Sequence, residues 1–129
     1  MTQTIRSYRD LVVWQKGLDL ITEVDGIVES FNSYQRWSLG MQMHRAAYSI
    51  ALNIAEGHDH DYSRVYLRRL ADAKGSVREV ESGMLVIRHC RYLPDRKTEP
   101  ALHLLNEIGR MLRSLSGRVR VDALAEHRW

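Results

Sequence analysis

The sequence has almost no cysteine, and it has no long apolar run. Cys90 is the only cysteine among 129 residues, so no disulfide can form within the chain, which suits a reducing cytosol. The longest uncharged run, Ala46 to Ala55, has ten residues and is too short to span a bilayer. The polar start, Met1 to Thr4, is unlike a signal peptide. We therefore expect a cytoplasmic protein with no membrane association.

Proline is nearly as scarce, and its placement predicts the architecture. Pro94 and Pro100 are the only two prolines, and they lie close together, so the rest of the chain can form long helices. No Gly-rich phosphate loop, strand pattern or internal repeat is present. A chain of this length makes one domain with a sizeable core, and we expect a single domain over residues 1–129.

Apolar residues recur at helical steps of three and four in four segments. These segments predict helices at about 8–31, 38–57, 63–92 and 99–119, followed by a loose tail over 120–129. Ser38 is the expected cap of the second helix, and Gly57 is expected in the left-handed position that ends it. The segments between these helices are only a few residues long, so each helix must fold back against the one before it. The expected fold is all-α, an antiparallel up-down-up-down left-handed four-helix bundle.

The charge is uneven along the chain. Residues 1–57 carry five basic and six acidic side chains, whereas residues 58–121 carry thirteen and eight. Six arginines lie off the core stripes and are the candidates for nucleic-acid binding: Arg64, Arg68, Arg78, Arg110, Arg113 and Arg120. Arginine makes up 16 of the 19 basic residues. This bias suits phosphate contacts, but a GC-rich genome would produce the same bias without any functional reason. Both interpretations stay open.

A second, polar stripe runs along each of the two central helices. We name this set the polar seam: Gln42, Arg45, Ser49, Asn53 and Glu56 on the second helix, with Ser76 and Glu79 on the third. If the two helices are antiparallel, Arg45 meets Glu79, and we predict an ion pair between them. Buried polar pairs can fix helix register, while the alternative is a shared binding site. Mid-helix glycines at 17, 75 and 109 predict close approach of neighbouring helices.

Three segments carry a family resemblance. QMHRAAYSIALNIAEG from Gln42 to Gly57, LADAKGSVREVE from Leu70 to Glu81, and LVVWQKGLDL from Leu11 resemble the four-helix-bundle proteins encoded by intervening sequences in bacterial 23S ribosomal RNA genes. Related accessory proteins of diversity-generating retroelements, their accessory variability determinants, form homopentameric barrels that bind nucleic acid and a reverse transcriptase. The resemblance implies a ring-forming bundle with RNA, a reverse transcriptase or another protein as partner. The polar seam, Ala46, Gly57 and Gly75 match the family pattern.

Other function classes have weaker support in the sequence. The turn His58-Asp59-His60-Asp61 offers alternating metal-ligand types without a third element to complete the shell, so we expect no metal site and no cofactor. No nucleophile has an adjacent base at a recognisable spacing, so we expect no enzyme activity. The wide apolar face of the first helix, with Trp14, Tyr34 and Trp37, supports a scaffolding oligomer that binds a protein partner.

Overall fold

The computed structural model describes residues 4–126 and contains helices but no strand within that range. Four long helices make the fold: α1 (Val12–Glu29), α3 (Met41–His58), α4 (Ser63–Cys90) and α5 (Glu99–Glu126). Four short helical segments connect or precede them: η1 (Tyr8–Asp10), α2 (Ser33–Gln35), η2 (Arg36–Gly40) and η3 (Asp95–Lys97). The predicted all-α four-helix bundle is confirmed.

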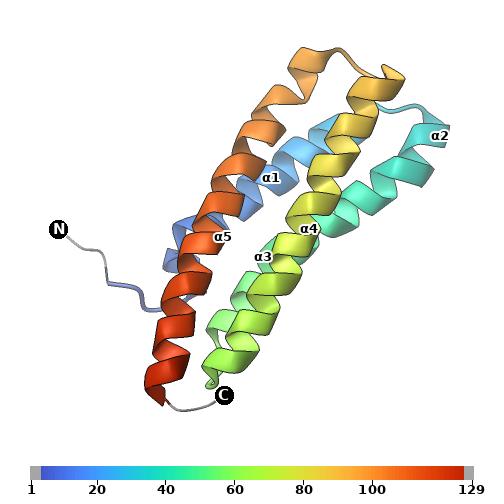
Figure 1. The fold of residues 1–129 in the computed structure, drawn as a ribbon. Coiled ribbons are helices and arrows are strands. Elements are labelled where there is room, and N and C mark those ends of the chain that lie inside the picture. The colour runs from blue at the N-terminus through green and yellow to red at the C-terminus, as the bar shows by residue number, and fades with distance from the viewer. Residues whose placement is uncertain (1–3, 127–129) are drawn as a thin grey trace.

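Each long helix runs back along the one before it (Figure 1). Gly17 of α1 faces Ala51 of α3, and Gly57 at the end of α3 faces Tyr66 near the start of α4. Arg88 near the end of α4 donates to Thr98 beside the start of α5. The fourth side of the bundle is closed by an ion pair from Lys16 of α1 to Glu107 of α5, at 3.0 Å. The left-handed sense of the bundle stays a prediction.

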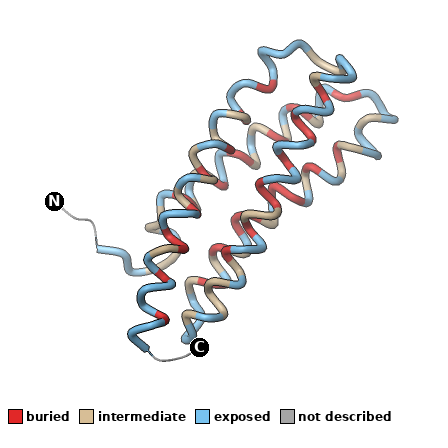
Figure 2. The backbone as a smooth tube through the Cα atoms, viewed as in Figure 1, coloured by how far each residue is buried: buried red, intermediate tan, exposed pale blue. Residues whose placement is uncertain are grey.

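The buried residues follow the apolar stripes predicted from the sequence (Figure 2). Five fully buried aliphatic side chains, Leu20, Ile50, Leu70, Ile87 and Ile108, come from all four long helices. Burial of such side chains, at about 1.5–3 kcal/mol each, is the main stabilising contribution to the bundle. No helix within residues 4–126 is long and apolar enough to cross a membrane.

The first two helices begin differently from the prediction. Leu11 has an extended backbone that separates η1 from α1, and Ser7 caps η1. The segment between α1 and α3 was expected to be a loop up to Trp37, but it is helical from Ser33. Its cap is Asn32 and not Ser38: Asn32 and Gln35 each accept a hydrogen bond from the other's backbone N–H.

The predicted end of the last helix is also wrong. α5 continues through the expected tail to Glu126, because Ala123 extends the buried stripe by one more turn. The hydroxyl of Ser63, at the start of α4, donates to both carboxylate oxygens of Glu126, at 2.9 and 3.0 Å. The remainder of the predicted tail, residues 127–129, lies outside the described residues.

Candidate functional site

The polar seam is a short hydrogen-bonded network at its centre. The buried hydroxyl of Ser76 on α4 donates to Oγ of Ser49 on α3 at 2.9 Å. The side-chain amide of Asn53 donates to both the hydroxyl and the backbone carbonyl of Ser49, each at 2.9 Å. These three side chains hydrogen-bond to one another and so connect α3 to α4, and Ser49 and Asn53 also line a surface depression with Arg45.

The predicted ion pair between Arg45 and Glu79 does not form. Both side chains are exposed, and they line different surface depressions. Arg45 lies with Tyr48 and Leu52, whereas Glu79 shares its depression with Gln42. The prediction is wrong because Gln42, one turn before Arg45, occupies the position beside Glu79.

The end of the polar seam at Glu56 lies against the first turns of α4. Glu56 pairs with Arg69 of α4 at 3.2 Å, a partner that the sequence pattern did not identify. The prediction that Gly57 is left-handed is wrong, because α3 continues through it to His58. Glycine fits there because a Cβ would lie 2.8 Å from the Tyr66 ring and 2.9 Å from Arg69 Cβ. The one positive φ among the described residues is at Arg91, which ends α4. Burial also raises the pKa of Tyr66 to about 12.

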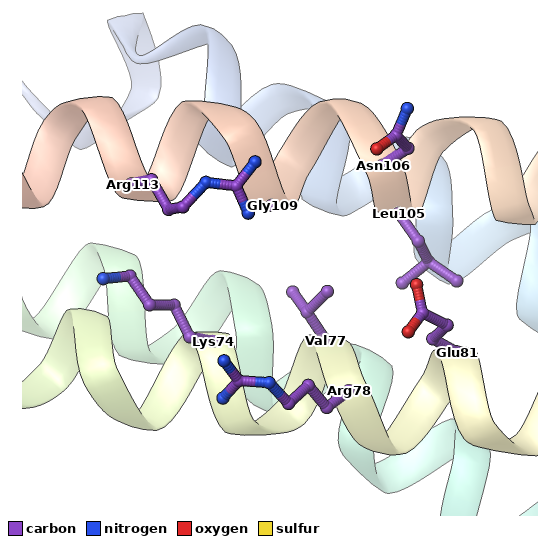
Figure 3. A pocket seen from close by; sticks show the side chains of 8 residues that line it. All are labelled: Lys74, Val77, Arg78, Glu81, Leu105, Asn106, Gly109 and Arg113. Carbon is purple, nitrogen blue, oxygen red and sulfur yellow. The ribbon is translucent and has the colours of Figure 1, made fainter.

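A groove of about 270 Å³ lies between α4 and α5 on the other side of α4. It is lined by Lys74, Val77, Arg78 and Glu81 of α4 and by Leu105, Asn106, Gly109 and Arg113 of α5. Lys74 and Arg113 lie at one end and Glu81 with Leu105 at the other (Figure 3). We call this the α4–α5 groove.

Cations converge on one end of the α4–α5 groove. The pKa of Lys74 is held below its ordinary value, first by burial and then by the positive charges of Arg120, Arg113 and Arg78. Within residues 4–126, no carboxylate forms an ion pair with any of these four cations. Four unpaired like charges in one place are unfavourable for folding and favourable for binding an anion.

Mid-helix glycines leave the surface beside these cations open. A Cβ at Gly75, Gly109 or Gly117 would meet no neighbouring atom within 4 Å. The predicted close approach of a helix is therefore confirmed at Gly17, where Ala51 Cβ would lie 3.5 Å away, and wrong at Gly75 and Gly109. The open glycines let another molecule approach the backbone of α4 and α5.

The six candidate arginines are all exposed, but the structure does not bring all of them together. Arg78 and Arg113 line the α4–α5 groove, and Arg120 lies close enough to Lys74 to affect its pKa. Arg110 of α5 lies instead near Glu107, whose pKa is lowered first by its hydrogen bond with Lys16 and only in small part by the charge of Arg110. Arg64 and Arg68 are exposed in the first turns of α4.

Sequence reasoning did not assign Glu81, Asn106 or Leu105 to a site. Glu81 is next to the buried Val80 and looked like an ordinary surface carboxylate. The sequence feature that could have indicated the groove is Gly109, a mid-helix glycine that lies close to cations of both α4 and α5. That signal needs the register between α4 and α5, which apolar periodicity alone does not define.

The histidines make separate contacts. His44 Nδ1 lies 2.7 Å from an Asp25 carboxylate oxygen, and its ring packs against Tyr48. His58, the last residue of α3, packs edge-on against Tyr66, and His60 in the turn that follows packs against Tyr62. Among residues 4–126, no three metal-ligating side chains are grouped closely enough to hold an ion.

A second surface, on α1 and α3, is apolar. A depression of about 280 Å³ is lined almost entirely by aromatic and aliphatic side chains from both helices and from η1. We name these residues the α1–α3 apolar surface: Tyr8, Trp14, Leu18, Ile21, Tyr48, Ala51, Leu52 and Ala55. Leu52 is 65% exposed. Tyr34 and Trp37, the other predicted interface aromatics, are exposed between α1 and α3.

Comparisons with known proteins agree with the fold. A solved structure from Bacteroides thetaiotaomicron, described as a protein with unknown function from the S23 ribosomal protein family, superimposes with a TM-score of 0.76. It is 21% identical in sequence, and the match covers 81% of this chain and 98% of that one. No curated protein matches the chain. The family model described as 23S rRNA-intervening sequence protein matches residues 9–114, and the chain therefore belongs to that family.

Proposed function

We propose that this protein is a non-enzymatic, homo-oligomeric bundle that binds RNA or other nucleic acid through the α4–α5 groove. The observation that carries the proposal is the convergence of Lys74, Arg78, Arg113 and Arg120 without a carboxylate partner among the described residues. Phosphate is the abundant biological anion that matches several cations spaced along two helices. Nucleic acid presents such phosphates in a row.

The open glycines support the same proposal. A glycine within a helix costs about 1 kcal/mol relative to alanine, and no packing contact accounts for Gly75, Gly109 or Gly117. All three are in α4 and α5, the helices that carry the cations. Close approach of a sugar-phosphate backbone gives these positions a role that side-chain packing within the bundle does not.

A non-enzymatic role fits the contacts of the candidate nucleophiles. The hydroxyl of Ser49 accepts hydrogen bonds from Asn53 and Ser76, and neither of these partners is a general base. Cys90 is exposed and interacts with Tyr92 rather than with a histidine. The proposed role therefore depends on binding and involves no covalent step.

A titration with two triple variants tests the proposal. Fluorescence anisotropy measures the binding of a labelled RNA hairpin and a DNA duplex at about 50 and 200 mM salt, the range over which phosphate contacts weaken strongly. The groove variant replaces Lys74, Arg78 and Arg113 by Ala. The control variant replaces Arg6, Arg9 and Arg36, which are exposed and belong to η1, η2 and the segment before η1, and it changes the net charge equally.

We expect the groove variant to lose about 100-fold in affinity at the lower salt concentration, while the control loses much less. The wild type should weaken steeply between the two salt concentrations. Absence of binding at low salt, or equal losses in the two triple variants, would overturn the assignment to the α4–α5 groove.

The α1–α3 apolar surface favours the oligomeric part of the proposal and also the alternative, a scaffold that binds a protein without a nucleic-acid role. Large apolar side chains that share one depression commonly mark protein interfaces. A pentamer is the assembly that the family resemblance implies, with a reverse transcriptase or another protein as a further partner. A ring would repeat the α4–α5 groove in every subunit.

Two charge substitutions test the assembly by light scattering after size exclusion. Leu52→Glu places a carboxylate on the α1–α3 apolar surface, and Leu124→Glu places one on α5, where Leu124 is 60% exposed. We expect Leu52→Glu to dissociate the oligomer and Leu124→Glu to leave its mass unchanged. A monomeric wild type at micromolar concentration would contradict the proposed assembly.

A further inference from the structure

The α4–α5 groove has two chemically different ends. Lys74, Arg78 and Arg113 give one end its positive charge, and Glu81 gives the other end a carboxylate. Figure 3 shows the guanidinium of Arg78 extending toward Lys74 and away from Glu81. No ion pair between Glu81 and a groove cation forms among the described residues, so its carboxylate is free to accept hydrogen bonds.

A carboxylate is unfavourable in a site that binds only phosphates. Glu81 follows Arg78 by three residues on the same helix and lines the same groove, so its charge repels a phosphate held there. That repulsion is offset where the carboxylate accepts a hydrogen bond from the ligand. A ligand with a donor close to its phosphate therefore suits both ends of the groove.

The ribose 2′-hydroxyl is such a donor. It occurs next to the phosphate of every RNA nucleotide whatever the base, and DNA lacks it. Between and beside the charged groups the groove is lined by Val77, by Leu105 next to Glu81 and by Gly109 next to Arg113, which allow the carbon face of a sugar to lie against them (Figure 3). A Cβ at Gly109 would contact nothing, so this part of the floor is open.

We propose that the α4–α5 groove selects RNA over DNA, with a backbone phosphate between Lys74, Arg78 and Arg113 and the adjacent 2′-hydroxyl donating to the Glu81 carboxylate. This inference rests on the proposed function and deepens it. The cations supply affinity for any nucleic acid, and Glu81 supplies discrimination between the two kinds of sugar.

The test uses three hairpins of one sequence: RNA, 2′-fluoro RNA and DNA. A 2′-fluoro hairpin keeps the A-form helix but has no 2′-hydroxyl to donate, so it separates hydroxyl recognition from recognition of helix shape. Binding is measured by anisotropy at about 50 mM salt for the wild type, Glu81→Ala and Glu81→Gln. Glu99→Ala is the matched control, because Glu99 is an exposed carboxylate at the start of α5 outside the groove.

We expect the wild type to bind RNA about tenfold more tightly than the 2′-fluoro and DNA hairpins, the size of one hydrogen bond to a charged group. Glu81→Ala should abolish the preference by weakening RNA binding and strengthening DNA binding. Glu81→Gln, which keeps an acceptor oxygen, should keep part of the preference. Glu99→Ala should behave as the wild type.

Two results would overturn the inference while leaving the proposed function in place. One is equal affinity of the wild type for RNA and 2′-fluoro RNA. The other is an equal gain in affinity for all three hairpins in Glu81→Ala, which would make Glu81 only a repelling charge. The proposed function itself fails on a different result, namely no binding of any hairpin, or binding that the triple Ala variant of Lys74, Arg78 and Arg113 leaves unchanged.

Discussion

The two sides of α4 differ in how completely the bundle uses them. Toward α3, the surface is closed: Gly57 lies under Tyr66, Gly83 lies under Met43, and Ser76 donates to Ser49. Toward α5, the surface is open at the cations, and Gly109 faces no neighbouring side chain. Glycine therefore allows close packing on the α3 side of α4 and leaves an accessible surface on the α5 side.

This difference separates residues that hold the bundle together from residues available to a partner. The polar seam was the most conspicuous polar pattern in the sequence, yet its central groups hydrogen-bond to one another and connect α3 to α4. The cations of the α4–α5 groove are scattered in the sequence and have no carboxylate partner among the described residues. Substitutions on the two sides should accordingly change different measurements.

Gly57→Ala should have the largest effect on stability. The added Cβ would lie 2.8 Å from the Tyr66 ring and 2.9 Å from Arg69 Cβ, so α3 and α4 must separate. We expect the free energy of unfolding to fall by about 1–3 kcal/mol in urea denaturation. Gly83→Ala is the comparison: its Cβ meets only the flexible Met43 side chain, so the loss should be smaller. An equal loss in both variants would show that side-chain flexibility does not decide the cost.

Ser76→Ala should have the next largest effect. It removes the hydrogen bond to Ser49 and should lower the free energy of unfolding by about 1 kcal/mol. RNA affinity should not change, because the seam has no part in the proposed site. A double-mutant cycle with Ser49→Ala measures the coupling directly. Loss of RNA binding by folded Ser76→Ala would move the binding site to the seam.

Gly109→Ala should stabilise the protein by up to about 1 kcal/mol, since the added Cβ meets open space. It should also weaken RNA binding by raising the floor of the α4–α5 groove. Gly26→Ala is the control, because Gly26 of α1 is equally open and lies outside the groove. Both variants should gain stability in urea denaturation, and only Gly109→Ala should lose RNA affinity. A loss of stability in Gly109→Ala would contradict the open floor.

Lys74→Met should have the smallest effect, and it depends on pH. Because the pKa of Lys74 lies below its ordinary value of 10.5, the unfolded chain holds this proton to higher pH than the folded protein. The wild type should therefore gain stability as the pH rises from the lowered pKa toward 10.5. Lys74→Met should lack this gain and be more stable at pH 7, with Lys97→Met as an exposed control. Parallel stability profiles for the two variants would contradict the crowding of charge at Lys74.

The four helices of the bundle were predicted well from the sequence, because the buried side of a helix requires apolar residues at a regular helical spacing. The stripe from Leu70 to Ile87 and the stripe from Ala101 to Val119 are buried as expected. Helix ends were predicted less well because they depend on single contacts. Asn32 and Gln35 form a capping box inside an expected loop, and Ser63 binds Glu126 beyond the expected end of α5.

The candidate site was predicted only in part. Arg78, Arg113 and Arg120 were identified from their charge and their positions off the apolar stripes, and the structure places all three near Lys74. The predicted ion pair of Arg45 with Glu79 was wrong, since Gln42 and not Arg45 lies beside Glu79, and the spacing along each helix does not define the register between them. The role of Gly109 could not be predicted, because it depends on which atoms of the other helices lie near it.

The contrast between the two sides of α4 can be measured on the glycines themselves. The chain has eight glycines, and nuclear magnetic resonance of a glycine-labelled sample follows each backbone amide during titration with a short RNA hairpin. We expect the amides of Gly75, Gly109 and Gly117 to shift, while those of Gly57 and Gly83 stay in place. Shifts at Gly57 and Gly83 without shifts at Gly109 and Gly117 would place RNA on the closed side of α4 and contradict the proposed site.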